Sequence, residues 1–134
     1  MSDKTPLVIV TRRLPELVET RMRGLFDVRL NASDTPMDAG ALKAAVADAG
    51  ILVPTVTDRV GPDIIEAAGP RLKLIANFGV GYNHIDAKAA AARGIAVTNT
   101  PGVLTDATAD IGLTLILALT RRAVEGMKLL EAGK

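Results

Sequence analysis

Short apolar runs alternate with amphipathic segments along the chain. Runs rich in β-branched and aliphatic residues predict five strands, at residues 7–11, 26–30, 51–55, 72–78 and 95–99. Segments with helical spacing, bounded by prolines and glycines, predict helices at residues 15–25, 37–49, 61–69 and 86–93, and a last, long one at about 105–132. Strands and helices that follow one another through such short connections are typical of a parallel sheet.

This alternation predicts the fold class and the domain organisation. Five strands in a chain of 134 residues indicate an α/β domain with the flavodoxin-like strand order 2-1-3-4-5 and helices on both faces. Right-handed crossovers between parallel strands favour this arrangement. We expect residues 1–104 to form this domain and residues 105–134 to form the long C-terminal helix.

Composition narrows the class of protein further. Hydrophobic residues make up 49% of the chain and aromatic residues only 2%, so the core must be built from aliphatic side chains and alanine. Sixteen basic residues balance fifteen acidic ones, which argues against binding to nucleic acid or to anionic membranes. There is no cysteine, and the apolar runs are too short for a secretory signal or for a membrane span of about 20 residues. These features predict a cytoplasmic protein that does not enter a membrane.

The stretch LIANFGVGYNHIDAKAAAARG contains an apolar run, a Gly-x-Gly turn and an alanine-rich helix. A dinucleotide-binding turn also needs a third glycine and an acidic residue at the end of the next strand. Here His84 takes the third glycine's place, residues 97–99 contain no acid, and Asp86 already occupies the positive end of the helix. The pattern therefore argues against a pyrophosphate site. Gly79 and Gly81 either make a tight turn and nothing more, or leave backbone amides free to bind one small carboxylate.

Other candidate sites in the sequence are weaker. Arg12 and Arg13 follow the first predicted strand, and a solvated charged turn explains them better than an anion site. The same region lacks the glycine of a flavin-phosphate loop and the paired acids of a two-component receiver domain. Asp106 and Asp110 stand at the start of the last helix with no histidine or cysteine nearby, and they fit the helix dipole better than a metal site. We predict no metal site.

Three motifs in this order, GVGYNHID, GIAVTNTPG and TADIGLTLIL, resemble the NAD(P)-dependent D-2-hydroxyacid dehydrogenases, in particular their glyoxylate/hydroxypyruvate reductase branch. VIVTRRLPE near the N-terminus is similar to the first strand and turn of that branch, so the resemblance covers essentially the whole chain. It implies the substrate-binding domain of such an oxidoreductase, with a helix that crosses to a Rossmann cofactor domain. The family's cofactor fingerprint and its catalytic arginine, glutamate and histidine are missing here. We therefore expect a truncated, catalytically inactive half that binds no cofactor itself, whereas the parent enzyme would use NAD(P).

The resemblance also assigns site residues. It implies that the backbone at Val80 and Gly81 holds the carboxylate of a small 2-keto acid, weakly in this chain, and that no residue of the chain is catalytic. Val56 and Leu104 match positions near the substrate pocket, and Thr108 matches a position that faces the nicotinamide. The alternative is a stand-alone flavodoxin-like module that binds no ligand and only dimerises.

The last predicted helix is apolar on almost every side. Its large apolar residues are Ile111, Leu113, Leu115, Ile116, Leu117 and Leu119. A helix with apolar residues all round has to be buried against something. We therefore expect a homodimer that forms through residues 105–130.

Overall fold

The computed structural model of the protein describes residues 5–134. The chain forms two compact units, the first ending at Thr100 and the second running from Pro101 to Lys134. Each unit is described by itself below. The domain boundary predicted at residue 104 remains a prediction.

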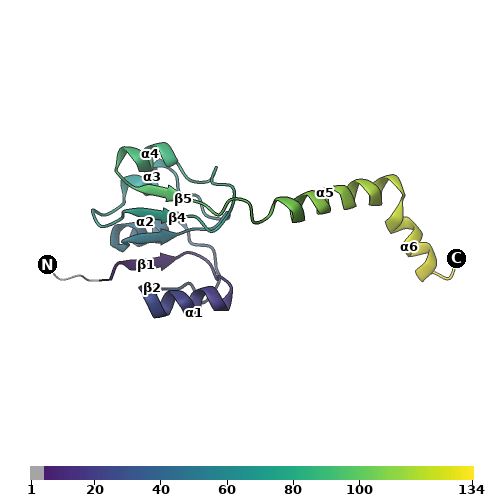
Figure 1. Cartoon of the computed structure of the whole chain (residues 1–134), viewed down its shortest axis with the longest axis horizontal. Coiled ribbons are helices and arrows are strands. Elements are labelled where there is room, and N and C mark those ends of the chain that lie inside the picture. The colour runs from purple at the N-terminus through teal and green to yellow at the C-terminus, as the bar shows by residue number, and fades with distance from the viewer. Residues whose placement is uncertain (1–4) are drawn as a thin grey trace. The chain divides into compact units, whose positions relative to one another are not determined.

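The first unit contains a five-stranded parallel sheet. Its strands are β1 (Leu7–Val10), β2 (Asp27–Arg29), β3 (Ile51–Val53), β4 (Leu74–Ala76) and β5 (Ala96–Thr98). They lie in the order β2-β1-β3-β4-β5, and every neighbouring pair is parallel (Figure 1). The predicted fold class and strand order are therefore confirmed, and each strand falls within the apolar run that predicted it.

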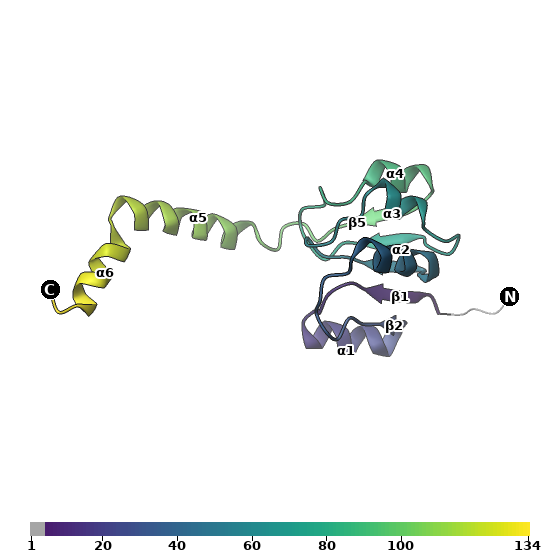
Figure 2. The same cartoon turned by 180° about the vertical axis from the view of Figure 1, so that it is seen from behind.

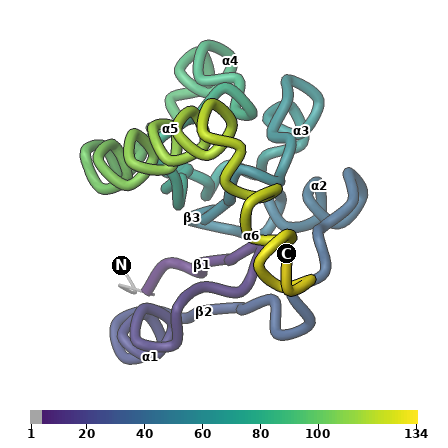
Figure 3. The backbone as a smooth tube through the Cα atoms, turned by 90° about the vertical axis from the view of Figure 1, so that its right-hand side faces the viewer, coloured from purple at the N-terminus to yellow at the C-terminus, as the bar shows by residue number. Residues whose placement is uncertain are grey.

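Helices cover both faces of this sheet, as expected. They are α1 (Glu16–Leu25), α2 (Ala39–Asp48), α3 (Pro62–Glu66) and α4 (Ala87–Ala92). Figure 3 is viewed along the strands and shows α1 on one side of the sheet and α2 and α3 on the other. Figure 2 shows the face of the sheet that α2 and α3 cover. Two of these helices begin at an aspartate that accepts a backbone amide, since Asp38 bonds the Ala41 amide at 2.7 Å and Asp86 bonds the Ala89 amide at 2.8 Å.

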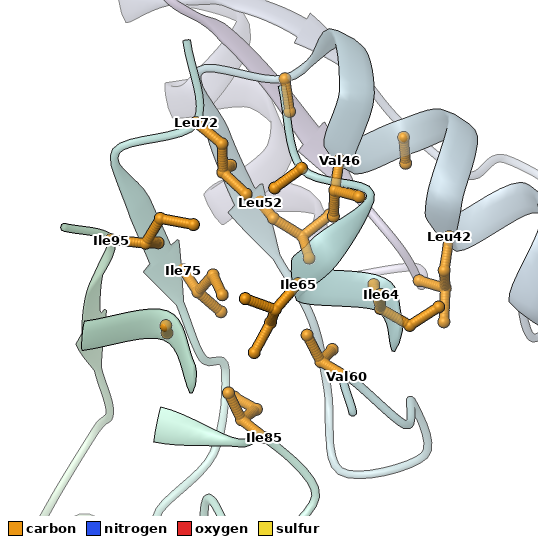
Figure 4. Close-up of a cluster of buried hydrophobic side chains, with 14 of the residues drawn as sticks. Leu42, Val46, Leu52, Val60, Ile64, Ile65, Leu72, Ile75, Ile85 and Ile95 are labelled. Atoms are coloured by element: carbon orange, nitrogen blue, oxygen red, sulfur yellow. The ribbon is translucent and has the colours of Figure 1, made fainter. Parts of the chain in front are cut away.

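The main core lies between the sheet and helices α2, α3 and α4. Strand residues such as Leu52 and Ile75, which are fully buried, pack there with Val46 of α2 and Ile65 of α3 (Figure 4). A smaller cluster on the opposite face contains Val8, Val10, Leu14 and Val53, with Met22 of α1 packed against it. Both clusters are aliphatic, as the low aromatic content predicts, and they hold the carboxyl ends of the strands in fixed register.

The C-terminal segment corrects one prediction, because it contains two helices instead of one long helix. These are α5 (Thr105–Thr120) and α6 (Ala123–Glu131). Arg122 between them has a φ of 50°, a left-handed conformation that ends a right-handed helix. The Thr120 hydroxyl donates to the Ile116 carbonyl at 2.9 Å, so a side chain competes for the carbonyls of the last turn of α5. Arg122 then donates to Glu125 in the first turn of α6 at 2.5 Å. An acidic residue in the first turn favours the start of a helix, so a second helix begins here.

Both C-terminal helices are exposed within their own unit. Neither contains a buried residue, and the large apolar residues of α5 from Ile111 to Leu119 are 57–78% exposed. No helix in residues 5–134 combines the length and the apolar character that crossing a membrane requires.

Candidate functional site

The loops that follow β3 and β4 lie side by side at the carboxyl edge of the sheet. The Phe78 amide donates to the Pro54 carbonyl at 2.9 Å, and Thr55 and Phe78 form a parallel bridge. This pairing brings Val56, whose side chain is 62% exposed, against the glycine turn. A Cβ atom placed on Gly79 would lie 3.1 Å from Val56 Cγ1. The structure therefore places the predicted site residue Val56 against the turn that contains Val80 and Gly81.

The carbonyl groups of the turn all accept hydrogen bonds from the protein. The Asn77 side-chain amide donates to the Gly79 carbonyl at 3.1 Å and to the Gly81 carbonyl at 2.9 Å. The Asn99 side-chain amide donates to the Val80 carbonyl at 2.8 Å. These bonds hold the acceptor side of the turn against the ends of β4 and β5.

The amides of Val80 and Gly81 have the opposite environment, whereas the Gly79 amide donates to the Asn77 carbonyl at 3.0 Å. Within residues 5–134, neither the Val80 nor the Gly81 amide donates to a protein acceptor. Val80 is half-buried and Gly81 is exposed. Free amides at a turn beyond the carboxyl ends of parallel strands can bind an anionic oxygen. The turn thus has the donors that a carboxylate needs.

Asn77 and His84 form a polar pair beneath the turn. The Asn77 side chain is only 3% exposed, and its Oδ1 lies 3.0 Å from His84 Nε2. Burial lowers the pKa of His84, and the charge of Asp58 opposes this shift. Sequence reasoning missed Asn77; the signal available was a polar residue directly after the apolar residues of β4. It considered His84 only as a turn residue in the place of a glycine.

The turn does not suit a dinucleotide. His84 occupies the third glycine position and is bonded to Asn77, and the Asp86 carboxylate already caps α4. After β5 comes Asn99, which holds the Val80 carbonyl and has no negative charge for a ribose hydroxyl. The residues present therefore do not fit NAD(P), and in the described part of the chain no three acidic, histidine or cysteine side chains gather as a metal site would require.

Comparisons with known proteins show the family of the chain. The family model for the D-isomer specific 2-hydroxyacid dehydrogenase catalytic domain matches residues 8–132. The chain belongs to the D-2-hydroxyacid dehydrogenase family. It is 42% identical over 129 residues to the glyoxylate reductase of Thermococcus litoralis, covering 96% of this chain and 39% of that protein.

Solved structures give the same result. A crystal structure of a protein from Thermus thermophilus matches with a TM-score of 0.82 and 41% identity, covering 95% of this chain and 40% of that one. The NADPH-dependent glyoxylate/hydroxypyruvate reductase from Sinorhizobium meliloti, in complex with NADP and malonate, matches with a TM-score of 0.74 and 32% identity. That match covers 97% of this chain and 39% of the reductase. The chain thus spans about two fifths of the length of these relatives.

The buried carboxylate of Asp58 stabilises the loop after β3, which contains Val56. Asp58 is 3% exposed and accepts the Thr11 hydroxyl at 2.5 Å and the Thr55 amide at 2.7 Å. These bonds join the carboxyl ends of β1 and β3. They fix the residue before Val56, and with it the start of the loop that lies against Gly79.

Arg12 and Arg13, which follow β1, both donate to Asp34, which follows β2. Arg12 Nε donates to Asp34 at 3.0 Å, and Arg12 Nη1 donates to the Thr57 hydroxyl at 2.6 Å. The bond from Arg12, together with that from the Arg13 amide, holds the pKa of Asp34 below its usual range. Arg12 therefore joins the loops that follow β1, β2 and β3.

Leu104 and Thr108 belong to the second unit of the chain. Leu104 directly precedes α5 and is 52% exposed, and the Thr108 amide donates to the Leu104 carbonyl at 2.9 Å. The two residues thus share the first turn of one helix. Their roles at a substrate pocket and beside a nicotinamide remain predictions.

Proposed function

We propose that this chain is the substrate-binding part of an NAD(P)-dependent reductase that converts a small 2-keto acid, such as glyoxylate or hydroxypyruvate, to the 2-hydroxy acid. The amides of Val80 and Gly81 bind the carboxylate of the substrate. The observation that carries the proposal is the polarity of the turn, whose carbonyls are bonded inside the protein while these two amides are not. The malonate in the Sinorhizobium meliloti reductase, a small dicarboxylate, agrees with such a ligand.

Neighbouring residues shape the rest of this subsite. Val56 provides an apolar wall, because its exposed side chain lies against Gly79 at the same edge of the sheet. Leu104 contributes further apolar surface, and Thr108 lies toward the nicotinamide in the complete active site. Hydride transfer also requires a dinucleotide site and a proton donor. Both come from polypeptide other than residues 1–134, because the glycine turn does not fit a dinucleotide and the single histidine is bonded to Asn77.

This chain alone should therefore bind a carboxylate and reduce nothing. Two charge-assisted hydrogen bonds without the remaining active site correspond to a dissociation constant on the order of 1 mM. Titration of the pure chain with oxalate should shift the amide NMR signals of Val80 and Gly81 in a saturable way. Oxamide, a neutral analogue of the same shape, serves as the matched control and should not saturate them. Equal responses to both compounds, or none at these residues, would reject the carboxylate site.

Catalytic inactivity has its own test. Purified chain mixed with NADPH and glyoxylate or hydroxypyruvate should show no loss of NADPH absorbance above the rate without protein. The chain joined to the cofactor domain of a relative is the positive control and should oxidise NADPH with both substrates. Turnover by the chain alone would contradict the proposal.

A second proposed property is a homodimer through α5 and α6. Six large apolar residues of α5, in Ile111–Leu119, are mostly exposed, although contiguous exposed apolar surface on a monomer rarely exceeds a few hundred Å². In sedimentation experiments at high micromolar concentration we expect a dimer, which Leu115→Glu should dissociate. Leu17→Glu on α1 makes the same change at an 87% exposed residue of the first unit and should leave the dimer intact. A wild-type monomer at that concentration would exclude this interface.

A further inference from the structure

Two asparagines at the ends of neighbouring strands hold the two peptide groups whose amides bind the carboxylate. We infer that Asn77 and Asn99 are the positioning residues of the carboxylate site and that His84 fixes the orientation of Asn77. This inference rests on the proposed function, because it explains how Val80 and Gly81 come to present their amides. Neither asparagine needs to touch the ligand.

The geometry of the peptide bond supplies the first step. A trans peptide is planar, and its C=O and N–H groups point in opposite directions. The Gly79 carbonyl and the Val80 amide belong to one such plane, so the bond from Asn77 to the Gly79 carbonyl turns the Val80 amide away from the protein. The Val80 carbonyl and the Gly81 amide share the next plane, which Asn99 holds in the same way. One asparagine thus orients each of the two amides.

The donor and acceptor inventory supplies the second step. Asn77 donates both hydrogens of its side-chain nitrogen to the Gly79 and Gly81 carbonyls. Its remaining polar atom, Oδ1, can only accept a hydrogen bond. His84 Nε2, 3.0 Å from that oxygen, must therefore carry a hydrogen. A flipped Asn77 would place its oxygen against two carbonyl oxygens and leave His84 Nε2 without an acceptor. Because Asn77 is 3% exposed, water cannot readily replace these bonds.

The two asparagines differ in how much support they have. The Gly79 carbonyl also accepts the Thr100 amide at 3.0 Å, so its peptide keeps one donor when Asn77 changes. Within residues 5–134, the Val80 carbonyl accepts a hydrogen bond from Asn99 alone. A change at Asn99 should therefore weaken anion binding more than a change at Asn77.

Asparagine-to-aspartate substitutions test this in the 134-residue chain, titrated with oxalate and followed by amide NMR. Asn99→Asp replaces the donor by an oxygen that repels the Val80 carbonyl, and Asn77→Asp does the same to the Gly79 and Gly81 carbonyls. Asn83→Asp is the matched control, because this exposed residue adds the same charge to the same loop. Relative to that control we expect the dissociation constant to rise about tenfold for Asn99→Asp and at least about threefold for Asn77→Asp. Folded variants that both bind within about twofold of the control would overturn the inference.

The His84 variants test the orientation of Asn77 without placing a charge in the loop. His84→Gln keeps an N–H near the position of Nε2, and His84→Leu removes it. In the ligand-free chain, we expect the Asn77 side-chain amide protons to exchange slowly with solvent in wild type and His84→Gln, and rapidly in His84→Leu. Oxalate affinity should follow the same order. Equal exchange in all three proteins would overturn the inference. This test decides the matter even if an aspartate variant does not fold.

These measurements separate the inference from the proposed function. If wild type gives no oxalate response while the Asn77 protons are protected and depend on His84, the carboxylate site fails and the positioning network stands. If oxalate binds at Val80 and Gly81 but the asparagine and histidine variants change nothing, the carboxylate site stands and the inference fails.

Discussion

Replacing Gly69 by alanine should strongly destabilise the first unit, although alanine is only one methyl group larger. Gly69 follows α3 and lies against the end of α2, and its amide donates to the Val46 carbonyl at 3.0 Å. A Cβ atom at Gly69 would lie 2.1 Å from the Ala47 carbonyl oxygen, which belongs to the backbone. The φ of Gly69 is not positive, so the methyl group itself causes the conflict.

The size of the effect follows from that distance. The two segments must separate by more than about 1 Å before the methyl group and the oxygen reach an ordinary contact. Overpacking of this kind costs about 1–3 kcal/mol, and weakening the bond from Gly69 to Val46 adds about 1 kcal/mol. We expect the free energy of unfolding to fall by about 2–4 kcal/mol, a large part of the roughly 5–15 kcal/mol that a domain has. The melting temperature should fall by about 10–25 °C.

Urea unfolding followed by the fluorescence of Tyr82, the only tyrosine in the chain, measures this in the first unit. Gly81→Ala is the matched control, because a Cβ atom there meets nothing within 4 Å and the φ of Gly81 is not positive. It adds the same methyl group and should change the free energy of unfolding by less than about 0.5 kcal/mol, or raise it slightly. If Gly69→Ala unfolds at the wild-type urea concentration, or Gly81→Ala is equally unstable, the steric argument is wrong.

Three further changes test other parts of the unit. Asp58→Ala leaves the buried Thr11 hydroxyl and the half-buried Thr55 amide without their acceptor, and it should lower the free energy of unfolding in urea by about 2–4 kcal/mol. An effect below about 1 kcal/mol would mean that water replaces the carboxylate. Burial lowers the pKa of His84 below its ordinary value of 6.5, so the unfolded chain binds the proton more readily. The free energy of unfolding should therefore be independent of the protonation of His84 above pH 6.5 and should decrease as the pH falls from 6.5 toward the lowered pKa. This pH dependence should be absent when His84→Gln is unfolded in urea. Arg93→Met removes donors from three carbonyls at and after the end of α3 and should lower the melting temperature, whereas Lys88→Met on α4 should not; equal melting of the two variants would count against it.

The strand order and the first four helices could be predicted because their signals are local. Apolar runs separated by proline, glycine and aspartate caps indicate where each element begins and ends. Connections that permit only right-handed crossovers then leave few possible sheet orders. The glycine turn could also be located, since Gly79 and Gly81 follow an apolar strand directly.

The break between α5 and α6 and the role of Asn77 could not be predicted in the same way. The apolar pattern in the sequence continues from Ile116 to Leu130 without a visible interruption. The hydrogen bond from the Thr120 hydroxyl to the Ile116 carbonyl, which occurs where α5 ends, does not alter that pattern. Asn77 acts through the Gly79 and Gly81 carbonyls and through His84, contacts that depend on how the turn folds back over the end of β4. Such roles depend on three-dimensional distances, which residue spacing does not contain.

The register between β4 and β5 explains why Asn77 and Asn99 can both reach the turn at residues 79–81. Ala76 pairs with Thr98, and the Asn77 amide donates to the Thr98 carbonyl at 2.9 Å, so Asn77 and Asn99 each follow the last residue pair of the ladder. A one-residue slip of β5 would turn the next side chain along the strand to the opposite face and remove the Asn99 donor from the Val80 carbonyl. The orientation of the Val80 and Gly81 amides is therefore a consequence of strand pairing in the buried sheet. It should persist without ligand, because the aliphatic core and not the substrate holds the two strands together.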